Sequence, residues 1–305
     1  FFFLSCFFIL VLMLPAFAQE EEKAQEQPLP ETAAPAEVSV EEIPALDRRL
    51  ETEEKVHANA FAITPHRPNY FLFLTYNSSP NNAAYAQAGG DLVDEYEVKF
   101  QLSLKILLWE HLFENNGHFY FAYTQLSFWQ LYNKALSSPF RETNYEPELM
   151  LAFDTNYTVL GLKNRLLTVS LDHQSNGRTE PLSRSWNRVY AQFLLERGNF
   201  VLSLKPWYRI PEDEAHDDNP DIYEYLGYGE VHAFYHWKNS VFGVMLRNNL
   251  RWEHNRGAVQ LDWSFPLTSK LKGYIQYFNG YGESLIDYNH SVNRIGIGFM
   301  FTDWL

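Results

Sequence analysis

The chain has 305 residues and a formal net charge of −14, and 17% of its residues are aromatic. This acidity argues against nucleic-acid binding, which depends on basic groups placed against phosphates. Cys6 is the only cysteine, so the rest of the chain holds no disulfide, no thiol nucleophile and no cysteine-bound zinc.

The first 18 residues carry no charge and end in the small-x-small sequence Ala16-Phe17-Ala18. The apolar run is short for a membrane helix, and its end fits cleavage before Gln19. We expect residues 1–18 to be a signal peptide, with a retained anchor as the less favoured alternative. A signal peptide followed by a chain without cysteine is typical of a bacterial envelope protein.

An acidic segment follows. Residues 19–60 contain twelve Asp or Glu against four Lys or Arg, and no aromatic residue. Such a composition buries too little apolar surface to offset the entropy cost of folding. We expect residues 19–65 to form a disordered acidic periplasmic arm, and a short helix near residues 45–56 is the alternative.

From about residue 66 the sequence has the periodicity of strands. Residues 95–106 alternate between polar and apolar side chains without a break. Twelve residues of period two form a strand long enough to cross a bilayer when tilted. The same pattern recurs and predicts twelve strands, near residues 69–77, 95–109, 118–132, 144–155, 164–175, 184–196, 199–210, 222–236, 240–250, 256–265, 269–280 and 290–302.

The connections between these strands alternate in length. Short turns are expected near residues 196–199, 238–239 and 266–269, and longer polar loops near 78–94, 133–143, 176–183, 211–221 and 281–289. The connections at 110–117 and 156–163 are longer than a tight turn and weaken the pattern.

An even number of strands with this alternation of loops is typical of an outer-membrane barrel. We therefore expect an all-β fold, a twelve-stranded antiparallel transmembrane β-barrel over residues 66–305, with a polar lumen filled by hydrogen-bonded side chains. A soluble β-sandwich or lipocalin-like barrel is the alternative, because alternation alone does not distinguish the inner face from the outer one.

Three polar residues interrupt the apolar face of two adjacent predicted strands. His173 and Ser175 continue the phase of Leu167, Val169 and Leu171. Asn187 has the same position at the start of the next strand. In a strand, residues two apart lie on one face, so a hydroxyl, an imidazole and an amide meet there. These are the nucleophile, base and orienting group of acyl-transfer chemistry.

The sequence around these residues resembles a known family. HQSNGR at residues 173–178, followed by SRSWNR at 183–188, closely resembles the active-site signature of bacterial outer-membrane phospholipase A. The resemblance covers about residues 66–305 and includes SSPFRETNYEP at 137–147, KPWY at 205–208, DDNPD at 217–221 and GYGESLIDYN at 280–289.

The resemblance implies a twelve-stranded barrel whose active site lies on its outer surface, at the level of the outer leaflet. It implies that Ser175 is the nucleophile, that His173 is the general base and that Asn187 orients His173. A neutral amide stabilises an imidazolium less than an aspartate does, which indicates that further electrostatic help is needed.

In the family this help comes from Ca²⁺, which acts together with the Gly177 backbone N–H on the oxyanion. The resemblance implies the Arg178 carbonyl and the Ser183 hydroxyl as calcium ligands. It implies one more carbonyl from a second subunit, that of Ser137, with the adjacent Ser138 as the alternative.

Gln125 is the candidate for a dimer interface. It continues the phase of Phe119, Phe121 and Tyr123, and the family places a glutamine here between subunits. An amide that faces lipid is costly without a partner. The alternative is that Gln125 points into the lumen.

The expected function is calcium-dependent hydrolysis of the sn-1 and sn-2 acyl esters of glycerophospholipids and of lysophospholipids. The expected location is the bacterial outer membrane, with the site toward the extracellular leaflet and a homodimer as the active form. A non-catalytic channel or transporter is the main alternative, and an inactive barrel of the same family is another.

Overall fold

Strands dominate the part of the chain that the structure describes. The computed structural model describes residues 45–57, 59, 62–87, 93–213, 215 and 217–303. The expected signal peptide and the first part of the expected arm, up to residue 44, lie outside these residues. None of the helices in the described ranges is long and apolar enough to cross a membrane.

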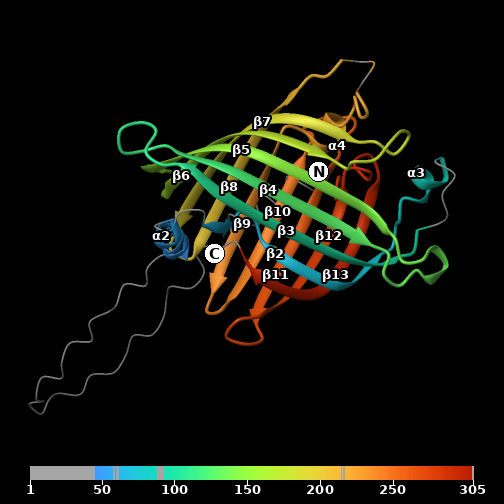
Figure 1. Cartoon of the computed structure of the whole chain (residues 1–305), viewed down its shortest axis with the longest axis horizontal. Coiled ribbons are helices and arrows are strands. Elements are labelled where there is room, and N and C mark those ends of the chain that lie inside the picture. The colour runs from blue at the N-terminus through green and yellow to red at the C-terminus, as the bar shows by residue number, and fades with distance from the viewer. Residues whose placement is uncertain are drawn as a thin grey trace, which may run out of the picture. The chain divides into compact units, whose positions relative to one another are not determined.

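Twelve of the described strands, β2 to β13, close into one antiparallel barrel (Figure 1). Each strand pairs with the next one along the chain, and β13 pairs with β2 to complete the ring. The predicted twelve-stranded antiparallel barrel is therefore confirmed. The strand bounds are β1 Ile63–Pro65, β2 Asn69–Asn77, β3 Tyr96–Trp109, β4 His118–Trp129, β5 Phe140–Val159, β6 Leu162–Ser175, β7 Ser185–Arg197, β8 Phe200–Ile210, β9 Gly229–Trp237, β10 Ser240–Asn248, β11 Gly257–Pro266, β12 Lys272–Tyr281 and β13 Ser291–Thr302.

Short β1 and the helices are not among the twelve strands of the ring. β1 pairs with β3 beyond the part of β3 that β2 occupies. The helices are α2 Ala45–His57, α3 Asn82–Gln87, the 3₁₀ turn η1 Lys134–Leu136 and α4 Tyr223–Leu226.

Two predicted boundaries are wrong. The strand expected over 222–236 begins only at Gly229, because Ile222 and Leu226 are at helical spacing and bury in the cluster that holds Trp186 and Trp207. The connection expected over 156–163 is a two-residue turn. Leu160 and Gly161 both have positive φ, as the primed hairpin turns require, and leucine is not a residue that signals such a turn.

The barrel has two different ends. The connections at 110–117, 160–161, 198–199, 238–239 and 267–271 form the turn end, and those at 78–95, 130–139, 176–184, 211–228, 249–256 and 282–290 form the loop end. The five connections at the turn end have two to eight residues, and the six at the loop end have eight to eighteen. This asymmetry is the one expected of an outer-membrane barrel.

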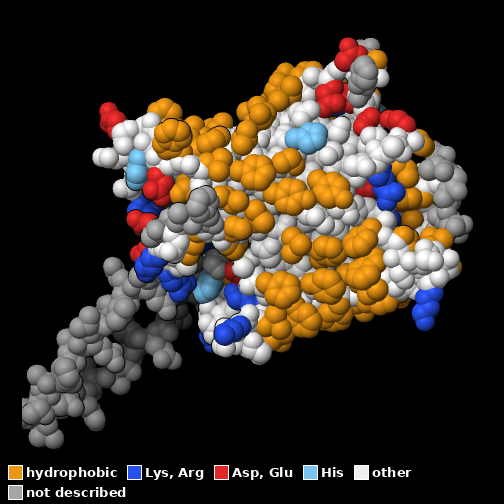
Figure 2. Space-filling model, viewed as in Figure 1, with side chains coloured by type: hydrophobic (Ala, Val, Ile, Leu, Met, Phe, Trp, Pro, Cys, Tyr) orange, Lys and Arg blue, Asp and Glu red, His pale blue; other side chains and the backbone are white. Residues whose placement is uncertain are grey.

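The strands turn their apolar phase outward. On β3, Leu102 is 52% exposed and Lys99 only 2%; on β6, Leu171 is 50% exposed and Asp172 only 1%. Figure 2 shows apolar side chains spread over the strands, with most charged groups at the two ends. A soluble sandwich or lipocalin-like barrel has its apolar side chains inside and its polar ones outside. The outward apolar side chains of this barrel are therefore suited to contact lipid. We call these outward apolar residues, which include Leu102, Leu149, Leu171, Val189 and Ile295, the lipid-facing wall.

The lumen is filled with paired charges, as predicted. Arg67 binds Glu146 at 2.8 Å, Arg188 binds the same carboxylate at 2.9 Å, and Lys99 binds Glu283 at 2.9 Å. Buried charges are tolerated when they are paired and hydrogen-bonded. A cavity of 210 Å³ remains between these side chains.

The closure of the barrel depends on a glycine. A Cβ on Gly298 of β13 would lie 2.0 Å from the carbonyl oxygen of Phe71 on β2. Only glycine therefore allows the last strand to approach the first so closely.

Helix α2 belongs to the segment expected as a disordered arm over 19–65. Leu46 is buried against Val201, Phe234 and Val241. A charged residue of α2 also pairs with one near the turn end of the barrel: Glu53 binds Lys105 at 2.7 Å. The expectation of disorder therefore does not hold for residues 45–57 and 63–65, and the helix that was its alternative is present.

Candidate active site

The three predicted catalytic residues lie at the loop end of β6 and β7. The register pairs His173 with Asn187, and Ser175 with Ser185. Nδ1 of His173 and Oδ1 of Asn187 are 2.8 Å apart. All three side chains are half-buried, and their neighbours in phase, Leu171 and Val189, belong to the lipid-facing wall. The structure thus brings an imidazole, an amide and a hydroxyl together on the outside of the barrel.

The hydrogen bonds of Asn187 favour one tautomer of the neutral His173 ring. An amide oxygen only accepts, so Nδ1 of His173 is the nitrogen that carries the proton and Nε2 is free to accept one. Nδ2 of Asn187 donates to Oε1 of Glu212 at 2.9 Å. Among the described residues, no hydrogen bond joins the Ser175 hydroxyl to His173. Catalytic contacts of this kind often tighten only when substrate binds.

The 176–184 loop is held by Asn176, which is buried. Its Oδ1 accepts from the backbone N–H groups of Arg178, at 3.3 Å, and Arg184, at 3.0 Å. Its Nδ2 donates to the carbonyl of Leu182 at 2.8 Å. One side chain therefore fixes both sides of the loop that follows Ser175.

Gly177 is required at its position for two reasons. Its φ is +63°, which favours glycine, and a Cβ would lie 3.2 Å from the ring of Tyr145. The glycine keeps the backbone beside Ser175 in this conformation.

The loop offers oxygen atoms of the types that bind calcium. Carbonyl, hydroxyl and carboxylate oxygens are the ligands that Ca²⁺ prefers. The Ser183 hydroxyl donates to Asp218 Oδ2 at 2.5 Å. The Arg178 guanidinium donates to the Arg141 carbonyl, also at 2.5 Å. Within the described ranges, no three His, Cys, Asp or Glu side chains are grouped to hold a metal. A cation here would therefore rely largely on carbonyl and hydroxyl oxygens.

Ser137 lies on a different loop, directly after η1. No hydrogen bond among the described residues connects it to Arg178 or Ser183. The carbonyl of Ser138 accepts from the indole N–H of Trp129 at 2.9 Å.

Gln125 points outward from β4. Its neighbours Thr124 and Leu126 line the internal cavity, so the alternating phase puts Gln125 on the other face. Its amide accepts from the Tyr123 hydroxyl at 3.3 Å and donates to the Ser127 hydroxyl at 3.1 Å. A chain of polar groups therefore runs along the outer face of this strand.

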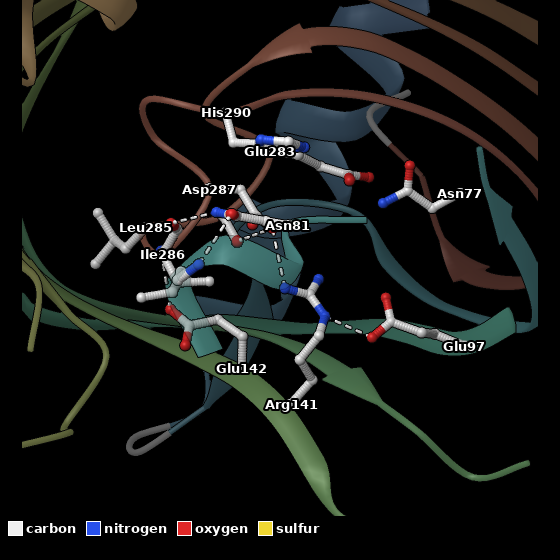
Figure 3. Close-up of polar contacts among 12 residues, drawn as sticks. Asn77, Asn81, Glu97, Arg141, Glu142, Glu283, Leu285, Ile286, Asp287 and His290 are labelled. Atoms are coloured by element: carbon white, nitrogen blue, oxygen red, sulfur yellow. Dashed lines mark hydrogen bonds and ion pairs between the residues drawn. The ribbon is translucent and has the colours of Figure 1, made fainter. Parts of the chain in front are cut away.

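A buried polar network supports the site from inside the loop end, and the sequence did not identify it as functional. In Figure 3, Arg141 lies between Glu97 and Asp287, with distances of 2.5 and 3.0 Å. Glu142 accepts from the Ile286 backbone N–H at 3.2 Å.

This network connects two of the motifs with the loop. Oε2 of Glu142 also accepts from Asn176 Nδ2 at 3.4 Å. The motifs at 137–147 and 280–289 are thus part of the support for the 176–184 loop. Both motifs stand out in the sequence, but a contact between residues 144 positions apart leaves no periodic signal.

A barrel with a charged interior and an apolar outer wall is a transmembrane β-barrel, and this one carries the residue types of a serine hydrolase on that wall. A family model described as Phospholipase A1 matches residues 46–301. The chain belongs to this family. The predicted resemblance to outer-membrane phospholipase A is confirmed, and with it the bacterial outer membrane as the location.

Relatives with known names support the assignment. The chain is 40% identical over 247 residues to phospholipase A1 of Escherichia coli K12, which covers 81% of this chain and 84% of that protein. It is 41% identical over 253 residues to a putative phospholipase A1 of Neisseria meningitidis, which covers 79% and 65%.

Solved structures agree with the fold. Outer membrane phospholipase A from E. coli matches with a TM-score of 0.73 and 40% identity, over 80% of this chain and all of that one. A Salmonella typhi outer membrane phospholipase, described as a dimer with bound calcium, matches with a TM-score of 0.74 and 39% identity, over 82% and 96%. A further E. coli structure, described as an active-site mutant with asparagine changed to alanine, has a TM-score of 0.75 and 39% identity, over 82% and 98%.

Proposed function

We propose that this chain is a calcium-dependent phospholipase that hydrolyses the sn-1 and sn-2 acyl esters of glycerophospholipids and lysophospholipids. The observation that carries the proposal is the hydrogen bond between His173 and Asn187 on the lipid-facing wall, two residues from Ser175. The named asparagine mutant of the E. coli relative supports Asn187 as an active-site residue.

The chemistry uses the two nitrogens of one ring. Nε2 of His173 takes the proton of the Ser175 hydroxyl as its oxygen attacks the ester carbonyl. Asn187 keeps the Nδ1–H in place, so the ring accepts at the correct nitrogen. The lysolipid leaves with the proton from His173, and an acyl-enzyme remains on Ser175. Water activated by His173 then releases the fatty acid.

The oxyanion is stabilised by the backbone N–H of Gly177. Bound Ca²⁺ would supply positive charge for the same oxyanion. The Arg178 carbonyl and the Ser183 hydroxyl would hold it, and Asp218 beside Ser183 adds negative charge. The Salmonella relative described with bound calcium supports this assignment.

A homodimer would be the active form, with phospholipid as its substrate. Ser137 would supply a carbonyl ligand to the calcium of the partner subunit, as the family resemblance implies. Ser137 is preferred over Ser138, whose carbonyl already accepts from Trp129. Gln125 would lie in the interface, where its amide and the Tyr123 hydroxyl meet the partner instead of lipid.

The site would face the extracellular leaflet, because the long loops of such barrels are extracellular and Ser175 is at the loop end. A substrate would enter sideways from the bilayer, with its acyl chain along the lipid-facing wall. Phospholipid is scarce in that leaflet while the membrane is asymmetric, so the enzyme would act when asymmetry is lost.

The test is fatty-acid release from mixed detergent–phospholipid micelles, with calcium and with chelator, by wild type and Ser175→Ala. The proposal predicts release that needs calcium and is lost in the mutant. Release that persists in Ser175→Ala would show that another group is the nucleophile. No release with calcium, together with conductance in a planar bilayer, would favour a channel.

A further inference from the structure

Asn187 makes hydrogen bonds to two partners of different kinds. Its Oδ1 accepts from His173, and its Nδ2 donates to Oε1 of Glu212 at 2.9 Å. Glu212 is in the 211–228 loop, just after β8. The register pairs Ile210 of β8 with Asn187, and Glu212 follows two residues later in the same outward phase. The carboxylate is therefore brought to the amide by the strand itself.

We propose that Glu212 is a positioning residue for His173: it fixes the amide of Asn187 with its oxygen toward the ring, and it adds a negative charge behind that amide. The inference deepens the proposed function and rests on it. It concerns what holds the Asn187 amide in its orientation toward His173.

The orientation of the amide matters because asparagine has two different ends. A rotated amide would present its NH₂ group to Nδ1, and Nδ1 would then have to be the unprotonated nitrogen. Nε2 would carry the proton and could not accept one from Ser175. A carboxylate only accepts, so Glu212 holds the NH₂ end of Asn187 and excludes the rotated state.

The charge of Glu212 would supply the negative charge that the neutral amide of Asn187 lacks. When His173 becomes an imidazolium, asparagine offers it a dipole where aspartate would offer a full charge. A carboxylate hydrogen-bonded to that amide polarises it and attracts the cation through it. Two other carboxylates of the same loop have partners elsewhere, because Asp217 binds Arg209 at 2.6 Å and Asp218 accepts from Ser183.

Glu212→Ala and Glu212→Gln separate the two roles. The full chain is assayed in calcium-containing detergent–phospholipid micelles, with circular dichroism to verify the barrel. We expect Glu212→Gln, which retains an acceptor, to lower kcat about fivefold, and Glu212→Ala to lower it about thirtyfold, each with little change in KM. Asp213→Asn removes the same charge from the adjacent position and is expected to stay within about twofold of wild type.

The decisive comparison uses Asn187→Asp. A carboxylate has two equivalent oxygens and needs no orientation, and Glu212 would then be a like charge beside it. In this background Glu212→Gln should leave kcat unchanged or raise it. An equal loss of activity in both backgrounds would mean that Glu212 only supports the loop, and would overturn the proposal.

The tautomer of His173 gives a readout that does not depend on turnover. With ¹⁵N-labelled histidine, wild type should show the proton on Nδ1, and Glu212→Ala should show a mixture of both tautomers. A wild type that releases no fatty acid would refute the proposed function, while the ring tautomer would still decide the role of Glu212. An unchanged tautomer in Glu212→Ala would overturn the orienting role.

Discussion

At the scale of residues, the site follows from the period of two in β6 and β7. His173 and Ser175 share a face because they are two apart, and the register of the hairpin brings Asn187 opposite His173. These three positions could be predicted, because polar residues in an apolar phase are visible in the sequence. Glu212 could not, because it lies in an irregular loop and its partner is 25 residues away.

Asn187→Ala should lower kcat by about 10² to 10⁴, because His173 loses the group that fixes its tautomer. The loss should not add to that of Ser175→Ala, because the two residues act in one step. Steady-state kinetics of the single and double mutants in calcium-containing micelles measures this. A double mutant whose loss equals the product of both single losses would contradict a shared step.

Gly177→Ala should affect both stability and catalysis. A positive φ costs an L residue about 1–2 kcal/mol, and the new Cβ would press on Tyr145 beside Ser175. Gly198 is the matched control, since its φ is +58° and nothing lies within 4 Å of its would-be Cβ. Both alanine variants should unfold more easily in urea, but only Gly177→Ala should lose activity. Equal activity losses would mean that the loop conformation at Gly177 has no special role.

At the scale of elements, the strands could be predicted and the irregular segments could not. Successive side chains of a strand in a barrel wall point alternately to lipid and to the lumen. Each pair of neighbouring residues therefore shows the apolar–polar alternation. Helix α4 consists of four residues, too few for a helical period to be distinguished. The sequence offers helix α2 only as an alternative to disorder, because this segment is acidic and has no aromatic residue. Its order comes from contacts such as that of Glu53 with Lys105, between residues far apart in the chain.

The docking of α2 should depend on pH. Burial alone would raise the pKa of Glu53, but Lys105 and Arg49 outweigh burial and lower that pKa from 4.5 to about 2. A carboxyl with a lowered pKa stabilises the folded state above its ordinary pKa, and this contribution, roughly 2–3 kcal/mol, is lost as the pH falls from about 4.5 toward 2.

Protease digestion measures this effect. Pepsin should cut wild type at α2 much faster at pH 2.5 than at pH 4.5, relative to a reference peptide. At pH 8, Glu53→Gln should expose α2 to trypsin, whereas Glu54→Gln, at an exposed position of the same helix, should not. Equal trypsin rates for the two variants would argue against the ion pair as the anchor of α2.

At the scale of the whole molecule, the barrel separates two environments. The lumen holds paired charges, and the wall is mostly apolar, with polar groups at the candidate active site and around Gln125 on β4. A polar group on such a wall is stabilised by a partner of its own kind. On the proposed function, the wall would let a substrate in the membrane reach Ser175 sideways, and the polar groups on β4 would favour association of two copies there.

Gln125→Leu should weaken the dimer by about 0.6–1.7 kcal/mol, which is roughly three- to eighteenfold in the dissociation constant. The measurement is sedimentation equilibrium in detergent with calcium, together with activity as a function of protein concentration. Leu261→Ala, on the distant strand β11, is the control for a changed wall residue. Full activity at every dilution of wild type would contradict activation by dimerisation.

The central claim is that Ser175, on the outer wall of the barrel, is the nucleophile of a lipid hydrolase. The most direct test is labelling with a long-chain alkyl sulfonyl fluoride, followed by mass spectrometry of the peptides. The account predicts one adduct, on Ser175, that needs calcium and is absent from Ser175→Ala and strongly slowed in Asn187→Ala. An adduct on another residue, or labelling at Ser175 that is as fast in Asn187→Ala as in wild type, would contradict it.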